Sequence, residues 1–571
     1  MSNPSETACD VLVVGSGGAG FTAAVTARKA GLDVLLIEKE ALLGGTTATS
    51  GGMLWIPGNP HSSEVVRGRP MEDAVASARS YVVAEGGNYV NPTRLDAFLD
   101  NGPRMISFLE QETDVKFYGM DYPDYYSEQP ESGDCRGIGS MDYELAKLGD
   151  DRAILKNQLP QMLFMGLAIG SSVEMKEFMR AGRSIKSMGF VVKRMLRHFY
   201  DVTRYGHDEQ VVRGRALIAR FIKSARDLGI PMWLSSPMKE LVKDASGRVT
   251  GAIVTTPKGD IHVTARKGVI LAAGGYSGDE ARRKATYPPL GSTANHATVA
   301  APGNTGDGIA AAEKAGGAFN GQVANVGAWM PVSVLPGKTG FENTWPHLVD
   351  RQKPGFIAVD RRGNRFVDES ASYHHFVPPM MRVCAEAGDS EACCWLVASK
   401  SAVDKWGMGF VRPFPVPRGN YVRNGYLIKA SSIAELAKKA GIDPAGLEAT
   451  VQKFNGYART GKDLDFKRGE RTYDLYQGDE EVGPNPCLGL IETGPFFAVK
   501  VVPGEIGTFA GLATDEHARV LDAAGAPIRG LYAVGNDQAS VFGGVYPGPG
   551  STLGPALTFG YIAGRHVSGQ S

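Results

Sequence analysis

Short apolar runs alternate with amphipathic stretches at both ends of this chain, which is the pattern of an α/β protein. Near the N-terminus the apolar run Val11–Val14 predicts a buried strand, Phe21–Gly31 a helix and Val34–Ile37 a second strand. The alternation returns in residues 213–275 and once more from Gly530, where GLYAVG predicts a strand before a last helix. We therefore expect the two ends to build one α/β domain into which the middle of the chain is inserted.

Glycines follow the first strand in a spacing that has a chemical meaning. Gly15, Gly17 and Gly20 stand in the order Gly-x-Gly-x-x-Gly, and Glu38 follows the second strand. The glycines permit a sharp turn into the helix and a close approach of the backbone to a pyrophosphate, while the acid is placed to accept from ribose hydroxyls. The complete unit predicts a Rossmann-like dinucleotide site rather than a glycine-rich turn without a ligand.

A second loop, Leu43–Gly52, is crowded with small and hydroxyl side chains that suit contact with a flat ring and a diphosphate. An ordinary polar loop is the alternative. Covalent attachment of FAD through this loop uses a histidine, and Met1–Pro60 contains none, so we expect FAD bound without a covalent bond. The first expected FAD-binding residues are Gly15, Ser16, Gly17, Gly18, Ala19, Gly20, Glu38, Lys39, Gly44, Gly45, Thr46, Thr47, Ser50, Gly51 and Gly52.

The remaining pattern divides the chain further. Residues 70–115 predict two helices, and the region 320–490 predicts a hairpin at 356–367 followed by helices near 431–440 and 444–459. The expected division is an FAD-binding domain formed by 1–125, 206–310 and 494–571, a helical basic insertion at 126–205 and an α+β catalytic cap domain at 311–493.

Residues 160–200 form a basic amphipathic segment. Its apolar residues recur at a spacing of three to four: Met175, Phe178, Met179, Ile185, Met188, Val192, Met195, Leu196 and Phe199. Basic residues lie between them: Lys176, Arg180, Arg183, Lys186, Lys193, Arg194 and Arg197. This composition suits an anionic membrane surface, and the alternative is a helical hairpin packed on the body with a solvated basic face.

Composition excludes several classes of partner. The chain of 571 residues has 61 Lys+Arg and 61 Asp+Glu, so no overall charge argues for nucleic acid binding. The six cysteines show no C-x-x-C pair and no metal-ligand spacing, which indicates reduced thiols and no metal site. The N-terminus is not a signal peptide and no apolar run is long enough to span a bilayer. We expect a cytoplasmic protein, with peripheral membrane contact through residues 160–200 left open.

With these segments in order, the chain resembles the fumarate reductase/succinate dehydrogenase flavoprotein superfamily, and within it the 3-ketosteroid Δ1-dehydrogenases. The resemblance rests on Tyr546-Pro547-Gly548-Pro549-Gly550-Ser551-Thr552 before the last helix, on RFVDESASY ending at Tyr373, and on a Pro-Asp-Tyr loop ending at Tyr125, with Tyr126 as an alternative. Asp368 departs from the asparagine common in relatives. The resemblance adds these expected FAD-binding residues: Ala273, Gly274, Asp307, Gly535, Asn536, Ser551 and Leu553.

The resemblance implies desaturation of the A ring of 3-ketosteroids, with an external acceptor such as a quinone reoxidising the FAD. The hydroxyl of Tyr546 and the N–H of Gly550 would hold the carbonyl oxygen, Tyr373 would remove the proton from carbon 2, and flavin N5 would accept the hydride from carbon 1. A free tyrosine has a pKa near 10, so Tyr125 would assist Tyr373 by favouring its phenolate. His374 or His375 is a rival base, although hydrogen-bonded loop histidines are the more ordinary interpretation.

Three other functions remain to be weighed. A fumarate-type reductase needs cations to bind carboxylates, and Ser540–Gly564 contains no Arg, Lys or His. A 3-ketosteroid Δ4-(5α)-dehydrogenase shares the fold, and only the complete set of tyrosines argues against it. A membrane-docked steroid-binding flavoprotein without turnover would leave the tyrosines without a role.

Overall fold

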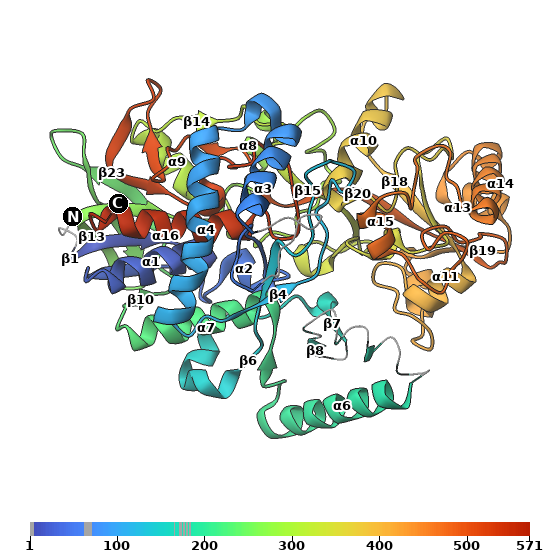
Figure 1. Ribbon diagram of the computed structural model, residues 1–571, viewed down its shortest axis with the longest axis horizontal. Helices are drawn as coiled ribbons and strands as arrows, with labels where there is room; N and C mark the ends of the chain where they lie inside the picture. Colours follow the sequence, from blue (N-terminus) through green and yellow to red (C-terminus); the bar gives the residue numbers. More distant parts are fainter. Residues whose placement is uncertain are drawn as a thin grey trace.

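The computed structural model describes residues 5–61, 71–164, 166–168, 170, 174, 177–178, 181 and 184–570. From the amphipathic pattern at 160–200, Met175, Lys176, Met179, Arg180, Gly182 and Arg183 lie outside the described residues. The chain has a mixed α/β architecture, with one sheet at the end that carries both termini and a second sheet at the opposite end (Figure 1).

The sheet beside the termini is assembled from distant parts of the sequence. Its strands are β1 (Ser5–Val14), β2 (Val34–Ile37), β10 (Met232–Trp233), β11 (Met238–Lys243), β12 (Val249–Thr256), β13 (Gly259–Leu271), β22 (Arg519–Leu521) and β23 (Pro527–Ala533). The order is β10-β2-β1-β13-β12-β11, and β23 pairs with β13 and β22. β1 is parallel to both β2 and β13, and β13 is parallel to β23. Strands from both ends of the chain therefore lie in one α/β sheet.

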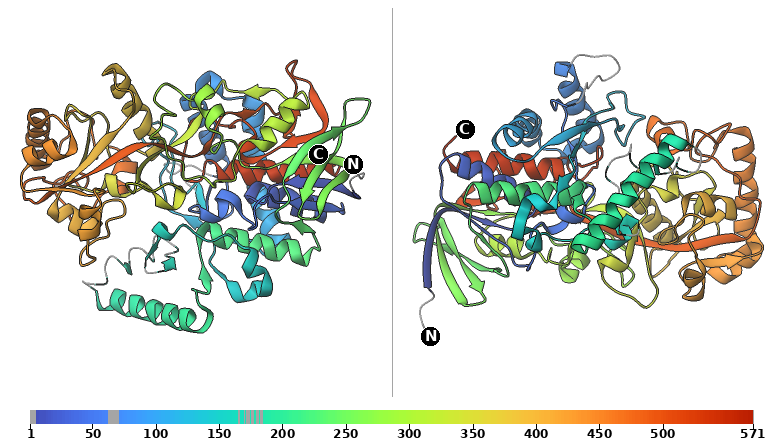
Figure 2. Two further views of the ribbon diagram at one scale, coloured as in Figure 1. Left: turned by 180° about the vertical axis from the view of Figure 1, so that it is seen from behind. Right: turned by 90° about the horizontal axis from the view of Figure 1, so that it is seen from below.

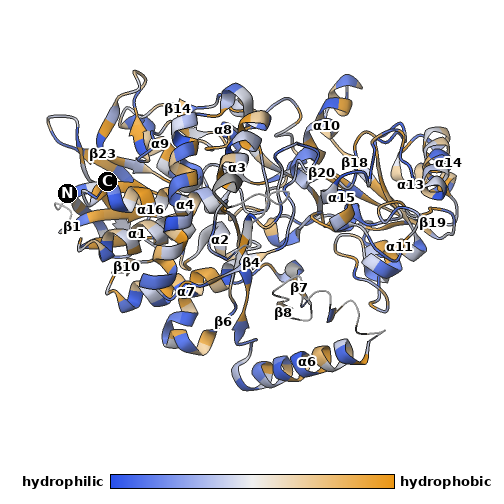
Figure 3. Ribbon diagram, viewed as in Figure 1, coloured by the Kyte–Doolittle hydropathy of each residue, from blue (hydrophilic) through white to orange (hydrophobic). Residues whose placement is uncertain are grey.

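Several helices pack around this sheet (Figure 1). They are α1 (Gly18–Lys29), α7 (Arg213–Asp227), α8 (Glu280–Thr286), α9 (Asp307–Lys314) and α16 (Leu553–Val567). α16 packs against α1 and against α4 (Pro92–Glu112), which follows α3 (Met71–Gly86) as the sequence predicts. α16 is hydrophobic and almost wholly buried, so the last helix of the chain forms part of the core (Figure 3).

One strand pattern differs from expectation in this sheet. The sequence suggests a strand at 261–265 and another at 268–275, separated by Arg266-Lys267. The structure has a single strand, β13, whose first half pairs with β12 and whose second half pairs with β23. A long strand can pass a charged pair when those side chains point to solvent, and both Arg266 and Lys267 are exposed.

The cap domain is built on the second sheet. Its strands are β15 (Gly327–Val334), β16 (Thr344–Pro346), β17 (Phe356–Val359), β18 (Cys394–Ser399), β19 (Ile428–Ala430) and β20 (Phe496–Thr508). The surrounding helices are α10 (Tyr373–Glu386), α11 (Lys400–Trp406), α12 (Gly419–Arg423), α13 (Ile433–Ala440), α14 (Pro444–Thr460) and α15 (Thr472–Gln477). α13 and α14 match the two predicted helices.

Two expectations for this region are wrong in detail. β20 lies in the centre of the cap sheet, paired with β15, β18 and β19, although the sequence assigned residues from 494 onward to the FAD-binding domain. Its apolar residues, interrupted by Lys500 and Glu505, fit either sheet and gave no signal for the choice. The expected hairpin at 356–367 has one strand, β17, and the returning segment makes only a single bridge, between Val359 and Arg365.

The remaining strands and helices are short, apart from one long helix. They are α2 (Gly45–Thr49), β3 (Met53–Trp55), β4 (Phe117–Met120), β5 (Gly137–Ser140), β6 (Tyr143–Glu144), β7 (Leu163–Phe164), β8 (Leu167–Ala168), α6 (Ile185–Tyr205), β9 (Gln210–Val211), β14 (Phe319–Asn320) and β21 (Gly511–Leu512). β5 pairs with β3 and β4, so residues 126–155 of the expected helical insertion are interwoven with the preceding segment. The long described helix of that insertion is α6, which lies at the lower margin of the molecule in Figure 1 and in the left view of Figure 2. Seen from below, it lies across the front of the body between the two ends of the molecule (Figure 2, right).

Candidate active site

The first glycine-rich turn is held in place from three sides. Gly15 has φ +111°, and a Cβ there would come within 2.3 Å of the carbonyl oxygen of Ala272. Ser16 donates to one carboxylate oxygen of Glu38 through its N–H at 3.0 Å and its hydroxyl at 2.5 Å. The same hydroxyl accepts from the N–H of Gly44 at 3.0 Å. The turn, the end of β2 and the second loop are thus fixed to one another around the N-terminus of α1.

Two threonines connect the second loop to its neighbours. The hydroxyl of Thr47 accepts from the N–H of Gly18 at 3.0 Å. The hydroxyl of Thr46 accepts from the N–H of Ala301 at 2.9 Å and from the side-chain amide of Asn304 at 3.0 Å. The structure therefore brings together the segments at 15–20, 44–52 and 301–307.

Two of the remaining expected residues pair with each other. The ammonium of Lys39 lies 2.5 Å from the carboxylate of Asp307 and 2.6 Å from the hydroxyl of Thr305. Asp307 opens α9, where a negative charge at the helix N-terminus is favourable. This pair closes the outer side of the same group of loops.

Asp537 is a site residue that the sequence interpretation missed. Its carboxylate accepts from the N–H of Ala273 at 2.6 Å and from that of Gly275 at 2.9 Å, so it fixes the loop after β13. Burial raises the pKa of this carboxyl to about 6, although the hydrogen bonds from the two N–H groups act in the opposite direction and lower it. The sequence did contain a signal for Asp537, because it is an acidic residue directly after Asn536, at the strand end that we expected to lie beside the cofactor.

The last loop approaches the first part of the chain closely. Gly550 has φ +93°, and a Cβ there would come within 2.4 Å of the carbonyl oxygen of Met53. The hydroxyl of Ser551 donates to the carbonyl oxygen of Gly548 at 2.6 Å and accepts from its N–H at 3.0 Å. Leu553 then begins α16. We call the segments 15–20, 44–52, 273–275, 301–307, 535–537 and 548–553 the cofactor loops.

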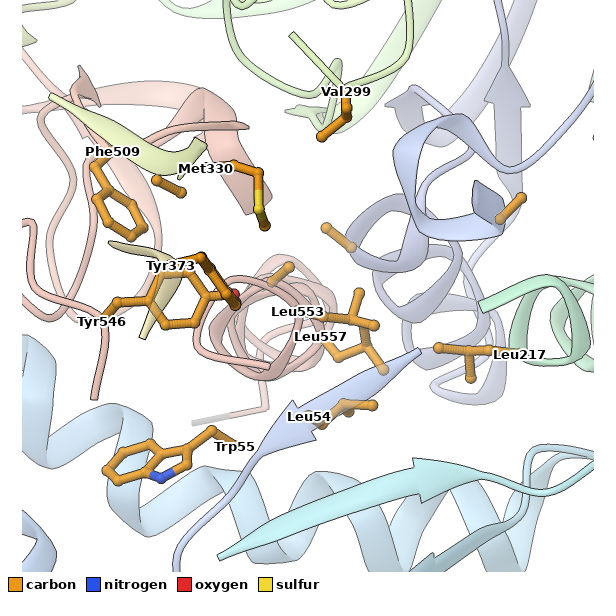
Figure 4. Packing of buried hydrophobic residues seen from close by; sticks show 14 of the residues in the cluster. Leu54, Trp55, Leu217, Val299, Met330, Tyr373, Phe509, Tyr546, Leu553 and Leu557 are labelled. Carbon is orange, nitrogen blue, oxygen red and sulfur yellow. The ribbon is translucent and has the colours of Figure 1, made fainter. Parts of the chain in front are cut away.

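The cofactor loops fit a dinucleotide that carries a flat ring. The first turns of α1, α2 and α16 contain no acidic residue, so backbone N–H groups there suit an anionic pyrophosphate. Apolar side chains from separate elements lie around one interior region beside these turns (Figure 4). They are Leu54, Leu217, Val299, Met330, Leu553 and Leu557.

Three tyrosines meet at the edge of this interior, and we call Tyr125, Tyr373 and Tyr546 the tyrosine cluster. The hydroxyl of Tyr125 donates to that of Tyr373 at 3.3 Å. The ring centroids lie 5.6 Å apart for Tyr125 and Tyr373, 5.3 Å for Tyr373 and Tyr546, and 5.6 Å for Tyr125 and Tyr546. Tyr125 lies in the loop after β4, Tyr373 opens α10, and Tyr546 precedes α16. The structure thus brings together three residues that are far apart in the sequence. Figure 4 shows two of them, Tyr373 and Tyr546, side by side.

The geometry separates Tyr125 from its neighbour Tyr126. The hydroxyl of Tyr126 accepts from the N–H of Tyr546 at 3.3 Å, so it contacts the backbone of the cluster. Its own N–H donates to the hydroxyl of Tyr81, which donates to the carbonyl oxygen of Pro547 at 2.7 Å. Tyr81 lies on α3, where nothing in the sequence distinguished it from a core residue.

A fourth phenol supports the cluster from the cap side. The ring of Tyr473, on α15, lies 4.9 Å from that of Tyr125, and its hydroxyl accepts from Gln352 Nε2 at 3.3 Å. No motif in the sequence pointed to this residue.

Burial sets the protonation of these groups. Burial and the neighbouring Tyr546 raise the pKa of Tyr373 well above its ordinary value, while the hydrogen bond from Tyr125 acts in the opposite direction. Burial also raises the pKa of Tyr125 well above its usual value, and it raises the pKa of Tyr546 as well. Phenols in this environment are neutral hydrogen-bond donors at neutral pH, and the one that receives a hydrogen bond from a neighbour is the best placed to lose its proton.

The two histidines after Tyr373 are poor bases. Burial lowers the pKa of His374 to about 3, and burial together with His374 lowers the pKa of His375 well below its usual value. His374 Nδ1 accepts from the N–H of Trp329 at 3.2 Å, and His375 Nδ1 lies 3.1 Å from the hydroxyl of Ser372. These contacts match the interpretation as hydrogen-bonded histidines.

Comparison with known proteins identifies the family of this chain. The sequence matches the FAD binding domain family over residues 10–553. The chain belongs to this family of FAD-binding flavoproteins. It is 40% identical over 563 residues to 4-oxocyclohex-2-ene-1-carboxylate 5-dehydrogenase of Sinomonas cyclohexanicum, covering 98% of this chain and 94% of the relative. It is 36% identical over 579 residues to 3-oxosteroid 1-dehydrogenase of Mycobacterium tuberculosis, covering 98% of each.

A solved structure is also similar to this one. The crystal structure of 3-ketosteroid Δ1-dehydrogenase from Sterolibacterium denitrificans, in complex with 1,4-androstadiene-3,17-dione, superposes with a TM-score of 0.91 at 34% identity over 98% of this chain and 99% of that chain. The family assignment makes this flavoprotein an FAD-dependent oxidoreductase, as the sequence predicted.

Within the described ranges, no group of three or more His, Cys, Asp or Glu side chains is placed to hold a metal ion. No two of the six cysteines, all of which lie in the described part of the chain, are joined by a disulfide. Among the described helices, none combines the length and apolar character needed to cross a bilayer.

Proposed function

We propose that this flavoprotein introduces the double bond between carbons 1 and 2 of 3-ketosteroids, converting a 3-oxo-4-ene into a 3-oxo-1,4-diene. The observation that carries the proposal is the hydrogen bond from Tyr125 to Tyr373, whose ring centroid lies 5.3 Å from that of Tyr546. Relatives named 3-oxosteroid 1-dehydrogenase and the related enzyme with a bound steroid dienedione support the substrate class.

In this proposal each residue of the site has a separate task. The hydroxyl of Tyr546 and the N–H of Gly550 donate to the carbonyl oxygen at carbon 3, and such donors typically contribute about 3–4 kcal/mol each to the transition state. Polarising this carbonyl acidifies the neighbouring carbon, and Tyr373 removes the proton from carbon 2. Tyr125 donates to the oxygen of Tyr373 as negative charge develops there. Bound FAD supplies the acceptor for the hydride from carbon 1.

The cofactor loops would hold FAD without a covalent bond. Gly15–Gly20 and the loop at 44–52 would hold the diphosphate, and Glu38 would accept from the ribose hydroxyls. Asp537 accepts from the N–H groups of Ala273 and Gly275 and so fixes the segment at 273–275, which would line the bound cofactor. An external electron acceptor, such as a quinone, would reoxidise the flavin.

A second candidate function is supported by a relative at 40% identity, whose name specifies a small oxocyclohexene carboxylate. Such a substrate carries the same ketone beside the bond to be oxidised, so the tyrosine cluster could act on it in the same way. A carboxylate needs a cationic or strongly donating partner, whereas the side chains around the interior are apolar and phenolic (Figure 4). We therefore rank the steroid first.

The test is anaerobic mixing of the purified protein with androst-4-ene-3,17-dione while the absorption band of oxidised flavin is recorded. Bleaching together with a 1,4-diene product is the expected result. Bleaching by 4-oxocyclohex-2-ene-1-carboxylate alone would select the second candidate. Absence of bleaching by either ketone, with rapid reoxidation of reduced enzyme by an enoate such as fumarate, would replace the proposal with a reductase.

A further inference from the structure

The helix α6 (Ile185–Tyr205) has its apolar face directed away from the protein. The residues of α6 that are buried against the body are polar: Ser187, Arg194, His198 and Asp201. Its large apolar side chains are exposed, including Ile185 at 94%, Leu196 at 65% and Phe199 at 52%. A surface helix of a globular protein normally has the opposite arrangement. Figure 3 shows hydrophobic and hydrophilic residues alternating along α6 at the margin of the molecule.

Ion pairs hold the helix in this orientation. Arg194 lies 3.2 Å from Glu174 and 3.1 Å from Asp208, and all three side chains are largely buried. Arg197 donates to Glu144 at 2.6 Å through its guanidinium. Rotating the helix to bury its apolar face would remove Arg194 from both carboxylates and leave buried charges unpaired, which is strongly unfavourable. The outward apolar face is therefore a fixed feature of the fold.

The exposed part of α6 carries cations and no carboxylate. At 100° per residue, Lys186, Lys193 and Arg204 fall on one flank of the apolar face, and all three are exposed. None of them makes an ion pair with an acid in the described part of the chain. The single carboxylate of the helix, Asp201, faces inward. This combination of apolar ridge and basic flank is complementary to an anionic lipid surface, whereas two copies joined through it would bring like charges together.

We propose that α6 docks the protein on an anionic bilayer surface, lying flat with Ile185, Val192, Leu196 and Phe199 inserted among the lipid headgroups and acyl chains. Its 21 residues give a helix of about 30 Å. The helix adsorbs to the bilayer without crossing it.

The docked helix would place the junction between the two sheets next to the lipid. The segment before α6 is tied to the cap domain, because Gln161 Nε2 donates to the carbonyl oxygens of Phe341 and Thr344 at 3.1 and 2.9 Å. Arg412 donates to the carbonyl oxygen of Leu163 at 3.0 Å. If the substrate is a steroid, as proposed above, docking brings a substrate dissolved in lipid to the side of the molecule where the cap meets the FAD-binding domain.

The test is co-sedimentation of the holoenzyme with vesicles of phosphatidylcholine that contain or lack phosphatidylglycerol. We expect binding to the anionic vesicles, weak binding to neutral ones, and release by high salt. The double variant Lys186→Gln/Lys193→Gln should bind about 25-fold more weakly, at about fivefold for each cation. Leu196→Ser/Phe199→Ser should lose most of the binding. Leu464→Ser, at another exposed leucine, is the matched control and should bind as the unchanged protein.

Flavin absorption and melting temperature establish that each variant is folded. Absence of binding to anionic vesicles, or equal binding by all variants, would overturn the proposal. So would a dimer in sedimentation velocity that dissociates in Leu196→Ser/Phe199→Ser, because α6 would then be an interface between copies. Vesicle binding does not depend on turnover, so failure of the proposed steroid oxidation leaves this result readable on its own.

Discussion

The cofactor loops and the tyrosine cluster are adjacent, but they hold their functional groups by different means. In the loops, buried acceptors fix backbone N–H groups, as Glu38 fixes Ser16 and Asp537 fixes Ala273 and Gly275. In the cluster, phenols contact other aromatic rings, and one phenol donates to another. The loops therefore use charged side chains to fix the position of the backbone, whereas the cluster uses neutral phenols.

This difference explains how the two regions can work side by side. Charged carboxylates in the loops gain hydrogen bonds from N–H groups that are present in every state of the reaction. A neutral phenol costs little to bury and becomes charged only when it takes part in proton transfer. Variants of the two regions should therefore differ: loss of a group that fixes the backbone should change stability, whereas loss of a group that changes protonation should change the rate, with the largest effect on the rate.

The largest effect is expected for Tyr373→Phe. Removing a general base typically costs 10²–10⁴-fold in rate, and we expect about 10³-fold loss in kcat with FAD still bound. Stopped-flow reduction of the flavin by the steroid measures the step directly. Tyr89→Phe, at an exposed tyrosine on the surface, is the control and should keep full activity. A Tyr373→Phe enzyme with normal kcat would remove this tyrosine from the mechanism and assign the proton transfer to another group.

Tyr546→Phe should cause the next largest loss of activity. It removes one donor to the developing negative charge on the carbonyl oxygen, which typically costs about 10²–10³-fold. The N–H of Gly550 remains, so activity should not disappear. Measuring kcat and KM separately checks the role, because a donor needed only in the transition state changes kcat, whereas an unchanged kcat with a raised KM would assign Tyr546 to ground-state binding.

The pH dependence should reflect the raised pKa of Tyr373. Burial and Tyr546 hold this phenol neutral at pH 7, and the active form of a base is the deprotonated one, so the rate of flavin reduction should rise with pH from 6 to 9. A base whose pKa lies above pH 9 gives up to a tenfold increase in rate for each pH unit within this range. A profile that falls with rising pH in this range would contradict a tyrosine base.

On the loop side, Asp537→Asn should change stability as a function of pH. The folded-state pKa of about 6 lies above the unfolded value, so this carboxyl stabilises the fold at low pH, and the contribution is lost as pH rises from about 4 to 6. The difference of about two pKa units corresponds to about 3 kcal/mol. Denaturant unfolding of both proteins from pH 4.5 to 7 should show this decline in the original protein and not in the variant.

The sequence predicted those parts of the molecule whose local pattern matches their environment. β2 was predicted at its observed bounds, because four buried apolar residues between polar neighbours have one simple interpretation. β20 was placed in the wrong domain, because its partners are decided by strands that are distant in sequence. Asp537 and Tyr473 were missed for the same reason, since their functional contacts form only in the folded chain.

α6 adds a further lesson of this kind. Its amphipathic character could be predicted from sequence, but periodicity does not tell which side of a helix faces the protein. The structure places the polar side inward, because Arg194 has buried carboxylate partners at Glu174 and Asp208. Similarly, the sequence left open whether Tyr125 or Tyr126 supports the base, and only the folded contacts distinguish them.

That distinction gives the smallest and most specific prediction. Tyr125→Phe removes a donor to a phenol that becomes charged, which typically costs about 1.5–3 kcal/mol, or about 10- to 150-fold in rate. Tyr126→Phe removes only the acceptor for the N–H of Tyr546, a neutral hydrogen bond whose loss typically costs about 1 kcal/mol, or about fivefold. Because Tyr125 favours the phenolate of Tyr373, its loss should also move the rise in rate to higher pH. Equal losses without such a shift would assign both tyrosines to packing, whereas a shift in Tyr126→Phe alone would exchange their roles.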